Sequence, residues 1–190
     1  MRVETLALAG WGLYLLVAAV VRAFVQWRQT GSTGLRRIGD TAMDRVAGLL
    51  FVAGNGIGAA APLAGAPDDV WIPGLVLFGL GLTGLLTAQY AMGSSWRIGV
   101  DPAERTGLVT GGPFALVRNP IFSAMIPLQL GLVLIAPNAL AVAGWLLVVL
   151  SIELQVRFVE EPYLRRTHGE AYGSYARRVG RFVPGSGRIE

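Results

Sequence analysis

Charged residues that could bind a small molecule lie on both sides of one apolar hairpin in this sequence. Arg118 ends a segment rich in glycine and proline, directly before the apolar run 121–136. The carboxylates of Glu160 and Glu161 follow the next apolar run. Two adjacent carboxylates repel each other unless a cation or a set of hydrogen-bond donors compensates their charge. Because a hairpin returns to the side on which it started, we predict that Arg118 and the two glutamates meet around one pocket.

The residues next to Arg118 indicate where it lies. Proline suits the first position of a helix and restricts the residue before it to extended or turn geometry, so a helix is expected to begin near Pro120. Arg118 then lies at the membrane–water boundary, beside free helix N–H groups that attract anions. The ordinary alternatives are an arginine that reaches lipid phosphates and a glutamate pair that is solvated beyond the membrane.

The composition is that of an integral membrane protein. Only 15% of the 190 residues are charged and 53% are hydrophobic, whereas a soluble domain carries about 25% charged residues. The absence of cysteine excludes disulfides and thiolate ligands. A single histidine, His168, leaves too few nitrogen ligands for a usual zinc or haem site, so no metal is expected.

Five apolar runs approach the length of about 20 residues that a membrane-spanning helix needs. They cover residues 6–24, 46–63, 71–92, 121–136 and 139–158. The expected fold is therefore all-α, a polytopic membrane protein with about five transmembrane helices and a cytosolic helical segment at the C-terminus.

The distribution of arginine orients these helices. The linkers after the first and third runs and the C-terminal tail are rich in arginine, whereas the linkers after the second and fourth runs have none. Because basic loops stay in the cytoplasm, five crossings place the N-terminus outside and the C-terminus inside, as in a protein of the bacterial inner membrane. Arginines beside apolar runs act as orientation signals and lipid contacts, so membrane lipids are expected partners and nucleic acid is not.

The C-terminal segment has an aromatic face at helical spacing. Tyr172, Tyr175 and Val179 fall on one side of a helix, and Gly169 is expected to end the helix before it. Pro162 is expected to break the helix that carries the glutamates. An amphipathic helix on the membrane surface is the ordinary interpretation of this pattern.

The motifs of the C-terminal half, taken in order, resemble the isoprenylcysteine carboxyl methyltransferases and related phospholipid methyltransferases. These are integral membrane enzymes that use S-adenosyl-L-methionine. The matching motifs cover about half of the chain, from Trp96 to Pro184, and are Gly112-Pro113-Phe114, Arg118-Asn119-Pro120-Ile121-Phe122, Glu160-Glu161, Gly169 to Tyr175, and Arg177-Arg178-Val179.

This chain departs from the family pattern at three positions. Asn119 stands where the family has histidine, and Phe114 and Phe122 stand where it has tyrosine. Asparagine donates and accepts hydrogen bonds but does not titrate near pH 7. A role of the family histidine in hydrogen bonding would therefore survive here, whereas a role as a base would not.

The resemblance implies that S-adenosyl-L-methionine is the cofactor. It implies catalytic roles for Arg118 and Glu160, and contacts from Trp96 and Arg118 to the substrate. The implied cofactor-binding residues come from both sides of the hairpin and are Gly112, Pro113, Val117, Arg118, Asn119, Pro120, Phe122, Glu160, Glu161, Leu164, Tyr172 and Tyr175. On this interpretation the tyrosine face flanks the adenosine.

The implied reaction is methylation of a lipophilic acceptor, an isoprenoid or other lipid that presents a carboxylate, a hydroxyl or an amine. A carboxylate acceptor needs positioning and exclusion of water but no base. An amine or a hydroxyl needs a base, and Glu160 is the candidate. We expect one domain, 1–190, with scaffold helices in 1–95, a methyltransferase-like region in 96–184 and a frayed tail in 185–190.

Two other classes of function stay open from the sequence. One is a non-catalytic membrane scaffold or a small transporter, in which Asn55, Gln89 and Gln129 within the apolar runs would line a path. The other is a membrane reductase of the sterol-reductase type that binds NADPH and resembles this family in its C-terminal half. The sequence also leaves open whether the chain forms a homo-oligomer.

Overall fold

The computed structural model describes residues 2–33, 41–67, 72–95 and 107–189. It is 81% helical, and the described part of the chain has no strand. The helices are α1 (Val3–Leu15), η1 (Leu16–Val21), α2 (Arg22–Thr30), α3 (Ala42–Ala60), η2 (Ala61–Ala64), α4 (Ile72–Met92), η3 (Gly93–Ser95), η4 (Gly112–Ala115), α5 (Pro120–Ile135), α6 (Ala139–Gln155), η5 (Val156–Glu160) and α7 (Glu161–Arg178).

The expected all-α membrane architecture is confirmed. Within the described residues, four helices are long and apolar enough to cross a membrane, namely Val3–Thr30, Ala42–Ala64, Ile72–Met92 and Ala139–Arg178. The fifth apolar helix, α5, has 16 residues. It therefore covers about 24 Å, somewhat less than the hydrocarbon thickness of about 30 Å. The helix begins at Pro120, as the sequence predicted.

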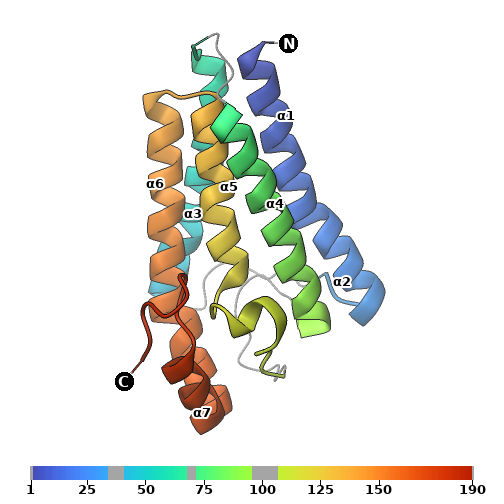
Figure 1. Ribbon diagram of the computed structural model, residues 1–190, viewed down its shortest axis with the longest axis vertical. Coiled ribbons are helices and arrows are strands. Elements are labelled where there is room, and N and C mark those ends of the chain that lie inside the picture. Colours follow the sequence, from blue (N-terminus) through green and yellow to red (C-terminus); the bar gives the residue numbers. More distant parts are fainter. Residues whose placement is uncertain (1, 34–40, 68–71, 96–106, 190) are drawn as a thin grey trace.

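The helices form one bundle in which α5 lies between α4 and α6 (Figure 1). The N-terminus lies at one end of the bundle, whereas α7 and the C-terminal tail lie at the other, next to η4 and the beginning of α5. Arg118, at the start of α5, and Glu160 and Glu161, before α7, therefore lie at the same end of the bundle. Termini at opposite ends of the bundle agree with an odd number of crossings, such as the five that the sequence predicts.

Glycines allow the closest helix pairs, α3 with α6 and α4 with α5, to pack backbone against backbone. A Cβ on Gly144 of α6 would lie 2.8 Å from the carbonyl oxygen of Gly54 on α3. A Cβ on Gly131 of α5 would lie 2.5 Å from the backbone nitrogen of Phe78 on α4. Larger side chains at these positions would force the two helix pairs apart.

The helix that carries the glutamates does not break at Pro162, so that prediction is wrong. The apolar helix α6 continues through η5, a π-helical turn, into α7 without interruption. The π-turn is wider than an α-turn and ends two residues before Pro162, where the ring and the missing N–H of proline need accommodation. The backbone turns instead at Gly169, whose φ of 52° lies in the region that glycine favours.

Candidate functional site

Arg118 and Glu161 are in contact, as predicted from the sequence. Arg118 Nη2 lies 2.7 Å from Glu161 Oε1, and the two side chains are 1% and 7% exposed. Arg181 donates to both oxygens of the same carboxylate, from Nε at 2.8 Å and from Nη2 at 2.9 Å. Glu161 thus carries one negative charge between two guanidinium groups at the end of the bundle.

Arg118 also holds the end of the chain. Its Nη1 donates to the carbonyl oxygens of Ala176, at 3.1 Å, and Val179. Its Nη2 donates to the carbonyl oxygen of Gly187 at 3.0 Å. These contacts use carbonyls at and beyond the end of α7, which have no partner within the helix. Of the guanidinium N–H groups, Nε alone is buried without a hydrogen-bond partner in the described part of the structure.

The segment after Arg118 is joined to the residues that follow α7, which we call the C-terminal strap (residues 179–189). Asn119 donates to the carbonyl oxygen of Arg181 from its backbone nitrogen, at 3.1 Å, and from Nδ2, at 3.2 Å. Ser123 Oγ donates to the carbonyl oxygen of Phe182 at 2.8 Å. Asn119 therefore fixes the strap through hydrogen bonds that need no titratable group.

The aromatic face of α7 is buried against η4. Tyr172 and Tyr175 are 1% and 4% exposed, and their ring centroids lie 6.2 Å apart in an edge-on arrangement. The hydroxyl of Tyr175 donates to the carbonyl oxygen of Phe114 at 2.6 Å. The two tyrosines thereby connect the last helix to the glycine-rich segment before Arg118.

Glu160 faces a different direction from Glu161 because successive side chains on a helix point about 100° apart. It is partly buried and lines a cavity together with Asp44. Burial raises the pKa of Glu160 to about 7, and the carboxylates of Asp44 and Glu161 act in the same direction. Burial also opposes the ionisation of Glu161, but hydrogen bonds from Arg181 and Arg118 outweigh it and lower its pKa. The adjacent glutamates thus have opposite electrostatic environments.

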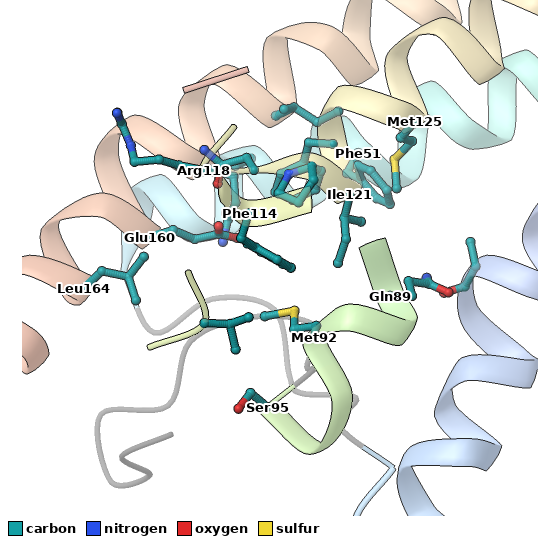
Figure 2. A pocket seen from close by; sticks show the side chains of 18 of the residues that line it. Phe51, Gln89, Met92, Ser95, Phe114, Arg118, Ile121, Met125, Glu160 and Leu164 are labelled. Atoms are coloured by element: carbon teal, nitrogen blue, oxygen red, sulfur yellow. The ribbon is translucent and has the colours of Figure 1, made fainter. Parts of the chain in front are cut away.

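The cavity has a volume of about 330 Å³, within the range of small-molecule sites. In Figure 2, Arg118, Phe114 and Glu160 group at one end, and Gln89 and Met125 lie at the other. The first end is polar, because Glu160 lies there and interacts electrostatically with Asp44, whereas the second lies between apolar helices. The lining also includes Tyr14, Leu15, Phe51, Val52, Met125 and Ile152.

Comparison with known proteins identifies the family. Residues 70–171 match the family described as phospholipid methyltransferase, which covers more than half of the chain. This chain belongs to the phospholipid methyltransferase family. The resemblance to isoprenylcysteine carboxyl methyltransferases agrees with it, since the two groups are related. A search of curated proteins found no match. The family match and the apolar helices support a membrane methyltransferase.

The cavity of this methyltransferase brings together most of the residues that the resemblance implied. Those that line it are Arg118, Asn119, Pro120, Phe122, Glu160, Leu164, Tyr172 and Tyr175. Four others are not part of the lining that the structure describes, namely Gly112, Pro113, Val117 and Glu161. Trp96, the expected substrate contact, lies outside the described residues.

Sequence reasoning did not assign Asp44 to the cavity, and it named Gln89 only as a residue that would line a path in a transporter. Asp44 lies in the first turn of α3, where its backbone nitrogen donates to the capping Thr41. Gln89 is 4% exposed and donates from Nε2 to the carbonyl oxygen of Ala18. An aspartate at the start of an apolar run was a visible signal. The helix face that carries it cannot be determined from that run alone.

Proposed function

We propose that this protein transfers a methyl group from S-adenosyl-L-methionine to a lipophilic amine or hydroxyl at the end of the bundle that carries α7. The observation that supports this function best is the single cavity that joins a polar end, at Glu160, to an apolar end between membrane helices. A cofactor with charged groups and an acceptor with a hydrocarbon chain need those two environments in contact.

The residues at the polar end fit this cofactor, which carries a carboxylate, an ammonium and a sulfonium. Arg118 lines the cavity and has a buried Nε–H without a partner in the described structure. A hydrogen bond from this group to a carboxylate or ribose oxygen would remove the cost of an unsatisfied donor. Glu160 presents a carboxylate to the cationic groups. Leu164 and Tyr172 offer apolar surface to the adenine. When bound, the cofactor supplies an electrophilic methyl group.

Arg118 is better assigned as a positioning residue than as the catalytic residue that the resemblance implied. Glu161 and three backbone carbonyls occupy all of its Nη donors. It therefore does not hold an acceptor carboxylate in the two-pronged manner that a free guanidinium allows. Its contacts fix α7 and the C-terminal strap against the start of α5, which positions the cavity wall.

Glu160 is the proposed base. An amine or a hydroxyl loses a proton when it is methylated, and a carboxyl group with a pKa near 7 matches that task at neutral pH. Glu160 lines the cavity, and its ionised carboxylate would repel an acceptor carboxylate. This charge favours an amine or a hydroxyl over a carboxylic acid.

We place the protein in a bacterial inner membrane, with the N-terminus outside and the site in the cytoplasm. The support is the alternation of arginine-rich and arginine-free linkers together with the position of the termini at opposite ends of the bundle. The partners are membrane lipids and a lipophilic acceptor. A single domain, 1–190, is consistent with the bundle.

Calorimetry on the detergent-purified protein tests the cofactor. We expect S-adenosylhomocysteine to bind and NADPH not to bind. Glu160→Gln should weaken binding, whereas the matched control Glu153→Gln, on the exposed side of α6, should not. Binding of NADPH alone would support the reductase interpretation, and binding of neither compound would contradict the proposed function.

A further inference from the structure

The apolar end of the cavity stops at the same level on four helices. The lining reaches Tyr14 on α1, Val52 on α3, Met125 on α5 and Ser151 on α6. One turn further along, each helix presents a buried residue that does not belong to the described lining. These residues are Trp11, Asn55, Gln129 and Val148, all less than 9% exposed. Together they close the cavity on the side away from Glu160.

Hydrogen bonds hold Tyr14 in this closed end. Gln129 Nε2 donates to the hydroxyl oxygen of Tyr14 at 3.1 Å and to Asn55 Oδ1 at 3.2 Å. Asn55 Nδ2 donates to the carbonyl oxygen of Phe51 at 2.8 Å. The network links three helices in the membrane interior, where no water replaces a lost hydrogen bond. Displacing the Tyr14 side chain would therefore leave buried polar groups unpaired.

Trp11 packs against Tyr14 on the side away from the cavity. The two rings lie 5.7 Å apart at an interplanar angle of 71°. Trp11 in turn fills the space beside Gly58, where a Cβ would lie 2.5 Å from the indole ring. A hydrocarbon chain that entered from the polar end could not pass between these rings without unpacking the core.

One side of the cavity faces the membrane instead. Leu15 and Val52 line the cavity and are also 39% and 57% exposed on the surface of a membrane-spanning bundle. They come from α1 and α3, whereas the extensive contacts of α3 are with α6. The exposure of these two lining residues points to an opening of the cavity between α1 and α3, next to Tyr14.

We propose that the fixed Tyr14 side chain ends the acceptor compartment and directs the hydrocarbon chain into the bilayer between α1 and α3, past Leu15 and Val52. The enzyme would then take lipids with flexible chains longer than its cavity. This inference rests on the proposed function, because it assumes that the reacting end of the lipid lies at Glu160. Ile152 lies eight residues before Glu160, which corresponds to roughly 12 Å along the helix. Chains longer than that distance must leave the cavity.

Thiol labelling tests the exit without relying on turnover. Because the chain has no cysteine, Val52→Cys can be labelled alone with N-ethylmaleimide. In the presence of S-adenosylhomocysteine, we expect octadecylamine to slow the labelling severalfold. Hexylamine, which is shorter than the path to the exit, should have no effect. Val76→Cys, 55% exposed on α4 and outside the cavity lining, is the matched control and should be unaffected by either amine.

Two results would contradict the proposed exit of the hydrocarbon chain between α1 and α3. One is labelling of Val52→Cys that octadecylamine leaves unchanged, and the other is an equal slowing at Val52→Cys and Val76→Cys, which would reflect only the amine in the membrane. A second variant, Val52→Trp, places an indole ring in the exit. It should lower the turnover of long-chain acceptors relative to short ones by roughly tenfold or more, which corresponds to a steric cost of about 1.4 kcal/mol in the transition state. Wild-type protein that binds S-adenosylhomocysteine but methylates neither chain length contradicts the proposed function and leaves the labelling result to decide the exit.

Discussion

Arg118 and Glu161 form a buried ion pair with 2.7 Å between Nη2 and Oε1, although 43 positions separate them in the chain. The pair joins the start of α5 to the start of α7 and so closes the hairpin that α5 and α6 form. Arg181 shares the carboxylate. The same contact that stabilises the end of the bundle also orients Arg118 at the cavity wall.

Replacing Glu161 with glutamine should destabilise the protein strongly. The change leaves Arg118 and Arg181 without their counter-charge in a buried place, and breaking such a pair costs about 3–5 kcal/mol. Chemical denaturation in detergent measures the loss in the free energy of unfolding. Glu153→Gln removes an exposed ion pair with Arg157 and should cost less than about 1 kcal/mol. Equal losses in the two variants would contradict the expectation that the buried pair contributes more to the free energy of unfolding than the exposed pair.

The rate of methyl transfer should rise with pH through the pKa of Glu160, about 7. The proton of an amine or hydroxyl acceptor needs an ionised base, and kcat/KM reports the ionisation of the free enzyme. The same group affects stability with the opposite sign. Burial raises its folded pKa above the ordinary value of 4.5, so the free energy of unfolding falls as the pH rises from there towards 7 and changes little above it. Glu160→Gln should remove both dependences. A rate profile that is flat between pH 5 and pH 9 in the wild type would exclude Glu160 as the base.

Asn119→Ala should loosen the C-terminal strap. The side chain donates to the carbonyl oxygen of Arg181, and the loss of one such bond costs about 1 kcal/mol. Hydrogen exchange should become faster in residues 179–189. Asn138→Ala removes hydrogen bonds at the far end of the bundle, to Ala61 and Gly65, and serves as the control. Unchanged exchange in the strap of Asn119→Ala would mean that the side chain does not hold it.

Gly180→Ala should disrupt the turn within the strap. A Cβ at this position would lie 2.1 Å from the carbonyl oxygen of Val183, and relieving such an overlap costs about 1–3 kcal/mol. Gly56→Ala adds a methyl group on α3 with nothing within 4 Å. Thermal unfolding in detergent compares the two variants. A lower unfolding temperature is expected for Gly180→Ala alone, and equal temperatures would contradict the tight turn.

The helices of this protein were predictable because the membrane sets their length and composition. Hydropathy located the apolar runs, and Pro120 marked the start of α5 to the residue. The meeting of Arg118 with Glu161 also followed from the sequence, since a short hairpin leaves little choice of partner for two buried opposite charges.

The different positions of the two glutamates, Glu161 on Arg118 and Glu160 in the cavity, were not predictable. Both residues are carboxylates in adjacent positions of a helix, so their side chains point in different directions. Residue type does not tell which of the two faces the cavity and which faces Arg118. The engagement of Arg118 by the carbonyls of Ala176, Val179 and Gly187 was hidden for a similar reason. Backbone acceptors are present at every position, so residue type gives no information about which of them a side chain reaches. Asp44 and Gln89 line the cavity because of the way α3 and α4 are rotated about their axes. The nearly uniform apolar runs do not specify this rotation.

Transfer of label from radioactive S-adenosyl-L-methionine to a lipid tests the central claim most directly. Purified protein is reconstituted in bacterial lipids, and the products are extracted and identified. We predict that the label appears in a lipid amine or hydroxyl, that Glu160→Gln abolishes it, and that Glu153→Gln retains it. Absence of labelled lipid with folded wild-type protein, or equal labelling by Glu160→Gln, would contradict the account.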